Sequence, residues 1–144
     1  METAVVMLVD DEVPFVETMT KRLTRRELKI LSAFNGLEAL EKLSKNKNVD
    51  VVILDVKMPG MDGIEVLEKI KKAHPLVEVI MLTGHATVET AIEGMKLGAF
   101  DYLMKPCELE QLIAKVDAAR AKKRGHEQKI LEARLNEIAT RGRG

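Results

Sequence analysis

The chain has 144 residues, 46% of them hydrophobic, and its 23 basic and 23 acidic side chains give a formal net charge of zero. This length suits one domain, and this apolar share supplies a continuous core, so a chain that is disordered throughout is excluded. A single cysteine, Cys107, and no apolar stretch near the roughly 20 residues of a membrane span predict a cytoplasmic chain without internal disulfide, signal peptide or membrane helix.

Short apolar runs alternate with longer amphipathic stretches from the start of the chain. Residues 4–9 are rich in β-branched side chains and too few for a long helix, so they predict a buried strand. Apolar residues then recur at helical spacing over residues 14–27, where Pro14 suits the first turn of a helix. Residues 29–33 predict a weaker strand, and the next helix has an apolar stripe that consists of Leu37, Leu40 and Leu43.

The same alternation continues through the second half of the chain. Residues 51–54 and 77–82 predict two more buried strands, separated by a loop and by a helix that stops near Pro75. A fourth helix over 86–97, a fifth strand over 100–104 and a fifth helix from Glu108 complete the pattern. Strands with two apolar faces and helical crossovers predict an α/β fold, in which helices cover both faces of a parallel sheet.

The C-terminal segment differs from the rest of the chain in charge. Residues 120–144 carry eight basic and three acidic side chains, whereas residues 1–119 carry 15 basic and 20 acidic ones. The basic run at 120–124 has no recognition motif and few aromatic residues near it. We therefore interpret it as a solvated helix end and expect no direct contact with nucleic acid.

The same segment marks the expected end of the domain. No apolar residue larger than alanine lies between Asp117 and Lys129, and Gly125 lies in this gap. We therefore expect one domain over residues 1–124 and a basic, partly helical extension or linker over residues 125–144. A narrow apolar stripe in the extension predicts a short helix, or a continuation of the fifth helix, that faces a partner; its members are Ile130, Leu131, Leu135 and Ile138.

Residues at the ends of the predicted strands are candidates for function, because ligands of open parallel sheets bind beyond the carboxyl ends of the strands. The first apolar run ends in Asp10 and Asp11, and the third ends in Asp55. Thr83 ends the fourth run, and Lys105 closely follows the fifth. Three carboxylates, one hydroxyl and one ammonium should therefore converge at one edge of the sheet.

This set of groups indicates phosphoryl chemistry with a magnesium ion. Mg²⁺ is usually held by one or two carboxylates, water and phosphate, and no His or Cys is needed. A carboxylate can also attack a phosphoryl group as a nucleophile. The negative charge of the transferred group would then be stabilised by the metal, the Thr83 hydroxyl and the Lys105 ammonium.

Each candidate also has an ordinary structural explanation. Asp10 and Asp11 could stabilise a helix start, and Asp55 could bond to backbone amides in a turn. Thr83 suits a strand, and Lys105 could be a solvated turn residue. The common position of these residues at strand ends favours one shared site over four separate explanations.

The candidates lie in four sequence blocks, which are LVDDE at 8–12, LDVKMPGMDG at 54–63, MLTGH at 81–85 and GAFDYLMKP at 98–106. In this order the blocks closely resemble the receiver domain of two-component response regulators. The resemblance covers about residues 3–122 and implies the flavodoxin-like fold of chemotaxis regulators, with five parallel strands in the order 2-1-3-4-5. The last two blocks further resemble the receivers of nitrogen-regulation type response regulators.

The resemblance implies a role for each of the acidic residues. Asp55 would accept the phosphoryl group. Asp10, Asp11 and Asp55 would hold Mg²⁺ together with the backbone carbonyl of Lys57.

The resemblance also implies roles for residues on the last two strands. Thr83 and Lys105 would bind the phosphoryl oxygens. Thr83 and Tyr102 would switch the surface made by the fourth helix, the fifth strand and the fifth helix. His85 would line the rim of the site and modulate hydrolysis of the acyl phosphate.

The expected function is a phosphorylation-dependent switch rather than an enzyme that turns over a substrate. The implied partners are a sensor histidine kinase or phosphotransfer protein and a downstream protein or output domain; a second copy of the chain is a further candidate. An alternative is a Mg²⁺-dependent phosphohydrolase with an Asp nucleophile, although such enzymes usually carry a second Asp where Lys57 stands here. A third interpretation, an unphosphorylated module that dimerises through its last helices, would not need three clustered carboxylates.

Overall fold

The computed structural model describes residues 3–84 and 87–142. Within these residues the chain forms one sheet of five parallel strands with the order β2-β1-β3-β4-β5. The strands are β1 (Val5–Val9), β2 (Lys29–Ala33), β3 (Val51–Leu54), β4 (Glu78–Thr83) and β5 (Asp101–Met104). Their order and direction confirm the predicted doubly wound α/β fold.

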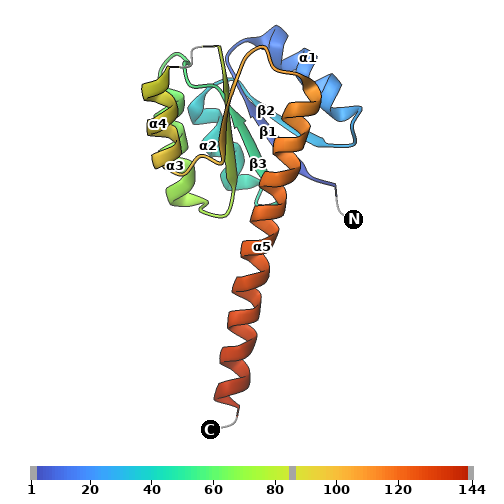
Figure 1. Cartoon of the computed structure of the whole chain (residues 1–144), viewed down its shortest axis with the longest axis vertical. Coiled ribbons are helices and arrows are strands. Elements are labelled where there is room, and N and C mark those ends of the chain that lie inside the picture. The colour runs from blue at the N-terminus through green and yellow to red at the C-terminus, as the bar shows by residue number, and fades with distance from the viewer. Residues whose placement is uncertain (1–2, 85–86, 143–144) are drawn as a thin grey trace.

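Helices cover the sheet on both faces. They are α1 (Val13–Thr24), α2 (Gly36–Lys45), α3 (Gly63–Ala73), α4 (Val88–Lys96) and α5 (Leu109–Arg141). Figure 1 shows α1 and α5 on one side of the sheet and α3 and α4 on the other. Side chains of α2 and α3 share one buried cluster with the sheet, and those of α1 and α5 share a second. In the described residues, no helix combines the length and the hydrophobicity that a membrane span requires.

The central strands are apolar because both of their faces are buried. Every residue of β1, β3 and β4 is buried. In β1, Val6 and Leu8 belong to the cluster with α1 and α5, whereas Met7 and Val9 belong to the cluster with α2 and α3. This alternation follows from the two-residue period of a strand. The continuous apolar runs therefore correctly predicted strands in the middle of the sheet.

Two predicted helix boundaries differ from the structure. The first helix ends at Thr24 rather than near Glu27, and Glu27 itself takes a left-handed conformation with φ of 66°. The fourth helix begins at Val88, because Thr87 caps it by accepting a hydrogen bond from the amide of Thr90.

The apolar stripe of α2 also differs from the prediction. Leu37 was expected to be buried but is 70% exposed. The helix instead buries Gly36, Ala39 and Leu43, which recur at spacings of three and four. A β-carbon at Gly36 would lie 2.5 Å from the Val66 side chain of α3, so glycine lets the two helices approach closely at this point.

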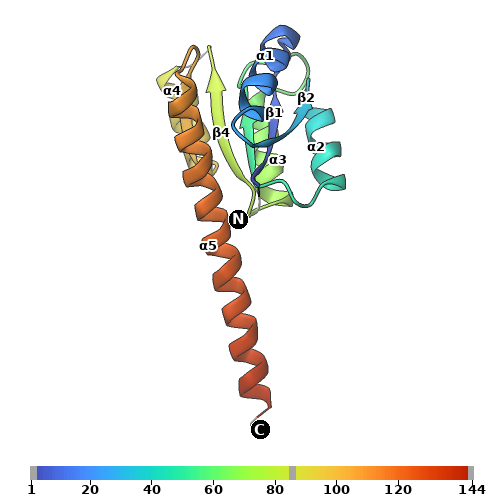
Figure 2. The same ribbon diagram turned by 90° about the vertical axis from the view of Figure 1, so that its right-hand side faces the viewer.

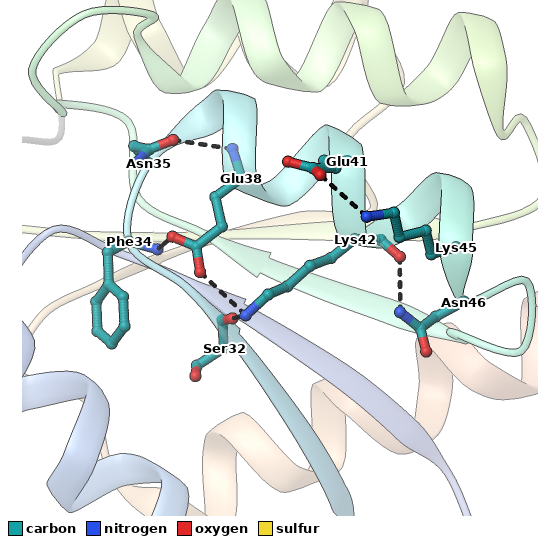
Figure 3. A network of polar contacts seen from close by, with 8 residues as sticks. All are labelled: Ser32, Phe34, Asn35, Glu38, Glu41, Lys42, Lys45 and Asn46. Atoms are coloured by element: carbon teal, nitrogen blue, oxygen red, sulfur yellow. Dashed lines mark hydrogen bonds and ion pairs between the residues drawn. The ribbon is translucent and has the colours of Figure 1, made fainter.

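Side chains of α2 also protect the edge of the sheet, where β2 has no further strand beside it (Figure 3). The Lys42 ammonium donates to the carbonyl of Ser32, and a Glu38 carboxylate oxygen accepts from the amide of Phe34 at 3.0 Å. Lys42 and Glu38 also form an ion pair at 3.0 Å. The amide of Phe34, followed by Lys42, lowers the pKa of Glu38. These bonds occupy backbone groups that could otherwise pair with another strand.

The last helix continues well beyond the expected domain boundary. α5 has 33 residues and runs through Gly125 without a break (Figures 1 and 2). The structure therefore favours a continuation of the fifth helix over a separate short helix. The predicted stripe of the extension is exposed, with side chains between 39% and 63% accessible, and it consists of Ile130, Leu131, Leu135 and Ile138.

Two buried acids anchor α5 where it leaves the sheet. Asp50 precedes β3, accepts from the amide of Val5 at 3.0 Å and pairs with the Lys123 ammonium at 3.0 Å. Glu78 begins β4 and pairs at 3.1 Å with both Lys71 of α3 and Lys122 of α5. Both carboxylates are only 2% exposed. This ionic anchor, defined as Asp50 and Glu78 with their lysine partners, joins α5 to the amino-terminal ends of two central strands.

We expect Asp50→Ala to lower the free energy of unfolding by about 3 to 5 kcal/mol, because it removes the buried acceptor of the Val5 amide and leaves the buried Lys123 ammonium with only the more distant Glu127 carboxylate at 3.7 Å. The measurement is equilibrium denaturation in urea. As a control, Glu41→Ala removes an exposed pair with Lys45 and should cost less than about 0.5 kcal/mol. Equal losses for the two variants would contradict the anchor.

Candidate functional site

Three carboxylates meet at the carboxyl-terminal edge of the sheet. Asp10 follows β1 and Asp55 follows β3, and these adjacent strands pair Val9 with Leu54 directly before the two acids. One oxygen of each of Asp10, Asp11 and Asp55 lies within 4.8 Å of the others. Asp10 and Asp55 are buried, whereas Asp11 is exposed. The structure thus brings together the three acids that sequence analysis predicted to converge.

Backbone hydrogen bonds fix the two buried acids. The amide of Asp10 donates to the carbonyl of Ala33 at 3.1 Å, and the amide of Asp55 donates to the carbonyl of Val9 at 3.0 Å. Each carboxylate also accepts from the amide two residues later, Asp10 from Glu12 at 2.9 Å and Asp55 from Lys57 at 3.3 Å. The carboxylates therefore point in directions that the sheet and its loops determine.

Lys105 is distant from the three acids in the sequence, but its side chain reaches the acidic cluster. Its amide donates to the carbonyl of Thr83 at 2.9 Å, and its peptide bond to Pro106 is cis. The ammonium nitrogen lies 2.6 Å from Asp10 Oδ2 and 3.7 Å from Asp55 Oδ2. Its position among these carboxylates agrees with the predicted convergence.

Burial and ion pairing compete in setting the pKa values of this pair. Burial is the largest influence on Asp10 and raises its pKa, although the Lys105 ammonium and the Glu12 amide act in the opposite direction. Burial alone would lower the pKa of Lys105, but hydrogen bonds to Asp10 and Glu12 outweigh it and raise that pKa. The Lys105 ammonium therefore stays charged. Because burial disfavours the ionised form of Asp10, a cation bound beside this carboxylate would stabilise that form.

Glu12 is a member of the site that sequence analysis did not identify. Its carboxylate lies 3.1 Å from the Lys105 ammonium and is 59% exposed. It precedes α1 in the N-cap position but makes no side-chain cap bond there. The only signal in the sequence was its place as the third acid of the Asp10-Asp11-Glu12 run.

Thr83 and Tyr102 lie on the neighbouring strands β4 and β5. Thr83 is fully buried at the end of β4. The Tyr102 hydroxyl lies 3.1 Å from the Thr90 hydroxyl of α4, a partly buried hydrogen bond that sequence analysis did not predict, since no motif includes Thr90. His85, the predicted modulator, lies outside the described residues.

The open side of the cluster is a pocket of about 460 Å³, lined by Asp11, Glu12, Asp55, Lys57, Met58 and Pro59. Lys57 is exposed at its rim. A molecule that enters this pocket can therefore approach the Asp55 carboxylate, which also lies 3.7 Å from the Lys105 ammonium.

A family model described as response regulator receiver domain matches residues 6–117. The chain belongs to this receiver family of two-component response regulators. Among curated proteins, this receiver is 37% identical over 119 residues to the DNA-binding transcriptional regulator NtrC of Escherichia coli strain K12. The match covers 83% of this chain and 25% of that protein. It confirms the predicted similarity to nitrogen-regulation type receivers.

Other relatives agree with this assignment. The transcriptional regulatory protein ZraR of Klebsiella oxytoca is 36% identical over 127 residues, which are 88% of this chain and 28% of that protein. A receiver domain protein from Clostridium thermocellum superposes with a TM-score of 0.80 at 36% identity and covers 84% of this chain and 97% of its own. The chain spans about a quarter of the length of the curated relatives that it matches.

A glycine of this receiver supports the backbone that carries Asp55. A β-carbon at Gly63 would lie 2.1 Å from the carbonyl oxygen of Asp55 and 2.6 Å from Val56 Cα. The Gly63 amide also donates to the carbonyl of Val56 at 2.6 Å. The first turn of α3 therefore rests directly on the backbone of the site, and no larger residue fits without moving it.

We expect Gly63→Ala to lower the free energy of unfolding by about 3 kcal/mol, since the new methyl group overlaps backbone atoms that cannot rotate away. Thermal and urea unfolding measure the loss. The matched control is Gly94→Ala in α4, where a β-carbon would make ordinary contacts at 3.8 to 3.9 Å. That change should leave the protein as stable or raise its stability by up to about 1 kcal/mol. A stable Gly63→Ala protein would contradict the close approach.

Proposed function

We propose that this receiver accepts one phosphoryl group on Asp55 from a sensor histidine kinase or phosphotransfer protein, with Mg²⁺ bound beside it. The single observation that carries the proposal is the position of the Asp55 carboxylate. It is 2% exposed, shares a 4.8 Å cluster with Asp10 and Asp11, and lies 3.7 Å from the Lys105 ammonium. A carboxylate that has both an ammonium and two further acids close to it suits attack on a phosphoryl group that a metal accompanies.

The donor groups of the site fit Mg²⁺. Three carboxylates lie against one ammonium, so the cluster carries excess negative charge in a partly buried place. All of the side-chain ligands are oxygens, which hard divalent cations prefer. Asp10, Asp11 and Asp55 would hold the ion together with the carbonyl of Lys57. The bound ion would neutralise charge on these acids and on the oxygens of the incoming phosphoryl group.

The transfer itself needs few groups of the protein. An oxygen of Asp55 forms a bond to phosphorus while the bond between phosphorus and the donor breaks, and the electron pair leaves with the donor. The Lys105 ammonium and the Thr83 hydroxyl bind the oxygens of the transferred group. The product is an acyl phosphate on the protein, so the chain is a switch and catalyses only its own modification and slow dephosphorylation.

The competing phosphohydrolase function has less support at this site. The residue two positions after Asp55 is Lys57, a cation, which cannot take a proton from water as an aspartate could. We assign the control of hydrolysis instead to His85, on the basis of its place two residues after Thr83.

The proposed route for output follows the last two strands. In this proposal Thr83 moves toward the phosphoryl group. The hydrogen bond between the Tyr102 and Thr90 hydroxyls then changes in response. The surface of α4 and β5 already exposes large apolar side chains, which supports docking of a downstream protein or output domain; they are Val88, Ile92, Met95 and Met104.

The receiver and its C-terminal extension divide the chain between them. Residues 1–124 would form the receiver and residues 125–144 the extension that links it to a partner or to a second copy. We place the exchange of phosphoryl groups in the cytoplasm, which the unpaired Cys107 supports. Direct contact with nucleic acid or membrane is not part of this proposal.

The first test is modification by a small phosphodonor. With Mg²⁺ and acetyl phosphate, we expect intact mass spectrometry to show one labile phosphoryl group, because the Asp55 carboxylate is the nucleophile. Asp55→Asn should remove the adduct, and chelation of Mg²⁺ should prevent its formation. Donor consumption in the same samples separates the candidates: one equivalent with slow renewal supports a switch, whereas sustained turnover would support a hydrolase.

The second test uses the raised pKa of Asp10. Below that pKa the carboxyl holds a proton, which competes with the cation, so the affinity for Mg²⁺ should fall as the pH decreases toward the ordinary aspartate value of 3.8. Calorimetric titration with Mg²⁺ over this range measures the effect. Asp10→Asn should bind more weakly and lose most of this pH dependence. A parent protein whose affinity does not change with pH would contradict the assignment of Asp10.

A further inference from the structure

The Lys105 ammonium has an aromatic neighbour as well as its acidic ones. Its nitrogen lies 4.0 Å from the centroid of the Phe15 ring, close enough for a cation–π interaction. The Lys105 side chain is 13% exposed, so little water weakens this attraction. Phe15 belongs to the first helical turn of α1, directly after the loop that carries Asp10, Asp11 and Glu12. Nothing in the sequence motifs pointed to this residue.

The acids alone do not hold the ammonium at Asp55. Asp10 is its nearest partner at 2.6 Å, followed by Glu12 at 3.1 Å, and Asp55 is the most distant at 3.7 Å. At 2.6 Å the ammonium already hydrogen-bonds to Asp10 Oδ2, so this acid draws it away from Asp55. An aromatic face attracts a cation but offers no oxygen to capture it. The ring can therefore hold the ammonium while leaving its N–H groups free to point at the acids.

Close packing does not fix the side chain either. A cavity of about 120 Å³ is lined by both Phe15 and Lys105, together with Met19, Arg22, Leu82, Pro106 and Cys107. A flexible lysine next to such a space has room to change its conformation. Its observed position therefore depends on the acids and on the ring.

The start of α1 fixes the ring itself. Pro14 occupies the first turn, and the amide of Val16 donates to the carbonyl of Glu12 at 3.0 Å. Phe15 is half-buried and packs against the apolar cluster below α1. A ring held by the helix and by the core, with a long lysine side chain against its face, is the arrangement expected of a residue that positions another.

We infer that Phe15 is a positioning residue for phosphoryl transfer, which holds the Lys105 ammonium between Asp10 and Asp55 so that it can reach the oxygens of the transferred group. This inference rests on the proposed function and extends it by one residue. In the transfer, the Asp55 oxygen binds phosphorus, and the donor leaves with the electron pair. Phe15 takes no part in these bond changes and acts through Lys105.

The test compares three proteins that differ in the ring. Phe15→Leu keeps an apolar side chain but removes the aromatic face, and we expect the rate of Asp55 modification at saturating acetyl phosphate and Mg²⁺ to fall about 3- to 10-fold. Phe15→Tyr keeps the face and should stay within about 2-fold of the parent rate. The concentration of Mg²⁺ that gives half of the maximal rate should not change.

The chain offers a matched control outside the site. The Lys122 ammonium lies 5.8 Å from the centroid of the Phe100 ring, which packs against the same apolar cluster as Phe15. Phe100→Leu thus removes another aromatic partner of a lysine and leaves Asp10, Glu12 and Asp55 unchanged. It should leave the modification rate unchanged. Thermal unfolding of all variants shows whether any rate loss follows stability instead.

A second measurement needs neither metal nor phosphodonor. In the parent protein, the side-chain protons of Lys105 next to the nitrogen should show upfield NMR shifts from the Phe15 ring. Phe15→Leu should abolish these shifts, and Phe15→Tyr should retain them.

The outcomes separate this inference from the proposed function. If the parent is modified on Asp55 and Phe15→Leu is modified equally fast, or if Phe15→Tyr is as slow as Phe15→Leu, the positioning role is overturned. Absence of the upfield shifts in the parent also overturns it, even where Phe15→Leu fails to fold. If the parent itself acquires no phosphoryl group from any donor or kinase, the proposed function fails and this inference fails with it.

Discussion

The structure depends on two like charges that the sheet holds side by side. Asp10 and Asp55 follow paired residues of adjacent parallel strands, so the register of β1 and β3 sets the separation of their carboxylates. Two buried acids at such a distance repel each other, and their burial is costly unless cations accompany them. Lys105, directly after β5, supplies part of that positive charge from two strands beyond β3 and three beyond β1. The remaining negative charge is the physical reason for proposing a divalent cation at this edge of the sheet, beside the proposed phosphoryl acceptor.

The amino-terminal ends of the strands, opposite the acidic cluster, also carry buried acids, but these acids have a structural role. There Asp50 and Glu78 are also buried, but each is matched by lysine side chains from the helices. Their charges are thus neutralised within the protein, and the pairs hold α5 against the sheet. One edge therefore leaves its acids partly unmatched, as the proposed metal site requires, and the other pairs each buried acid with lysines, which stabilises the packing of α5.

The sequence predicted the fold and the acidic cluster because both follow from strand ends. Short β-branched runs give buried strands, and the residues after Val9 and Leu54 must meet when those strands are parallel neighbours. The order of the strands came from the family resemblance, since periodicity alone does not set it.

Contacts that depend on the orientation of one side chain were not predictable in the same way. The ring of Phe15, the hydroxyl of Thr90 and the carboxylate of Glu12 reach their partners through rotamers and helix phases that no local pattern encodes. The exposure of Leu37 has a similar cause, since the close contact of Gly36 with α3 rotates the helix. The apolar gap before Lys129 did not end α5, because alanine, lysine and arginine favour helix without needing a core.

The unbroken course of α5 gives the molecule a mechanical property. From Lys123 at the ionic anchor to Arg141, 18 steps along the helix at about 1.5 Å each carry the chain roughly 27 Å from the sheet. A tilt of α5 by about 5° at the anchor would displace the far end of such a rod by roughly 2 Å. A small change of angle beside the sheet would therefore become a larger displacement at the end of the extension, large enough to make or break a contact between side chains.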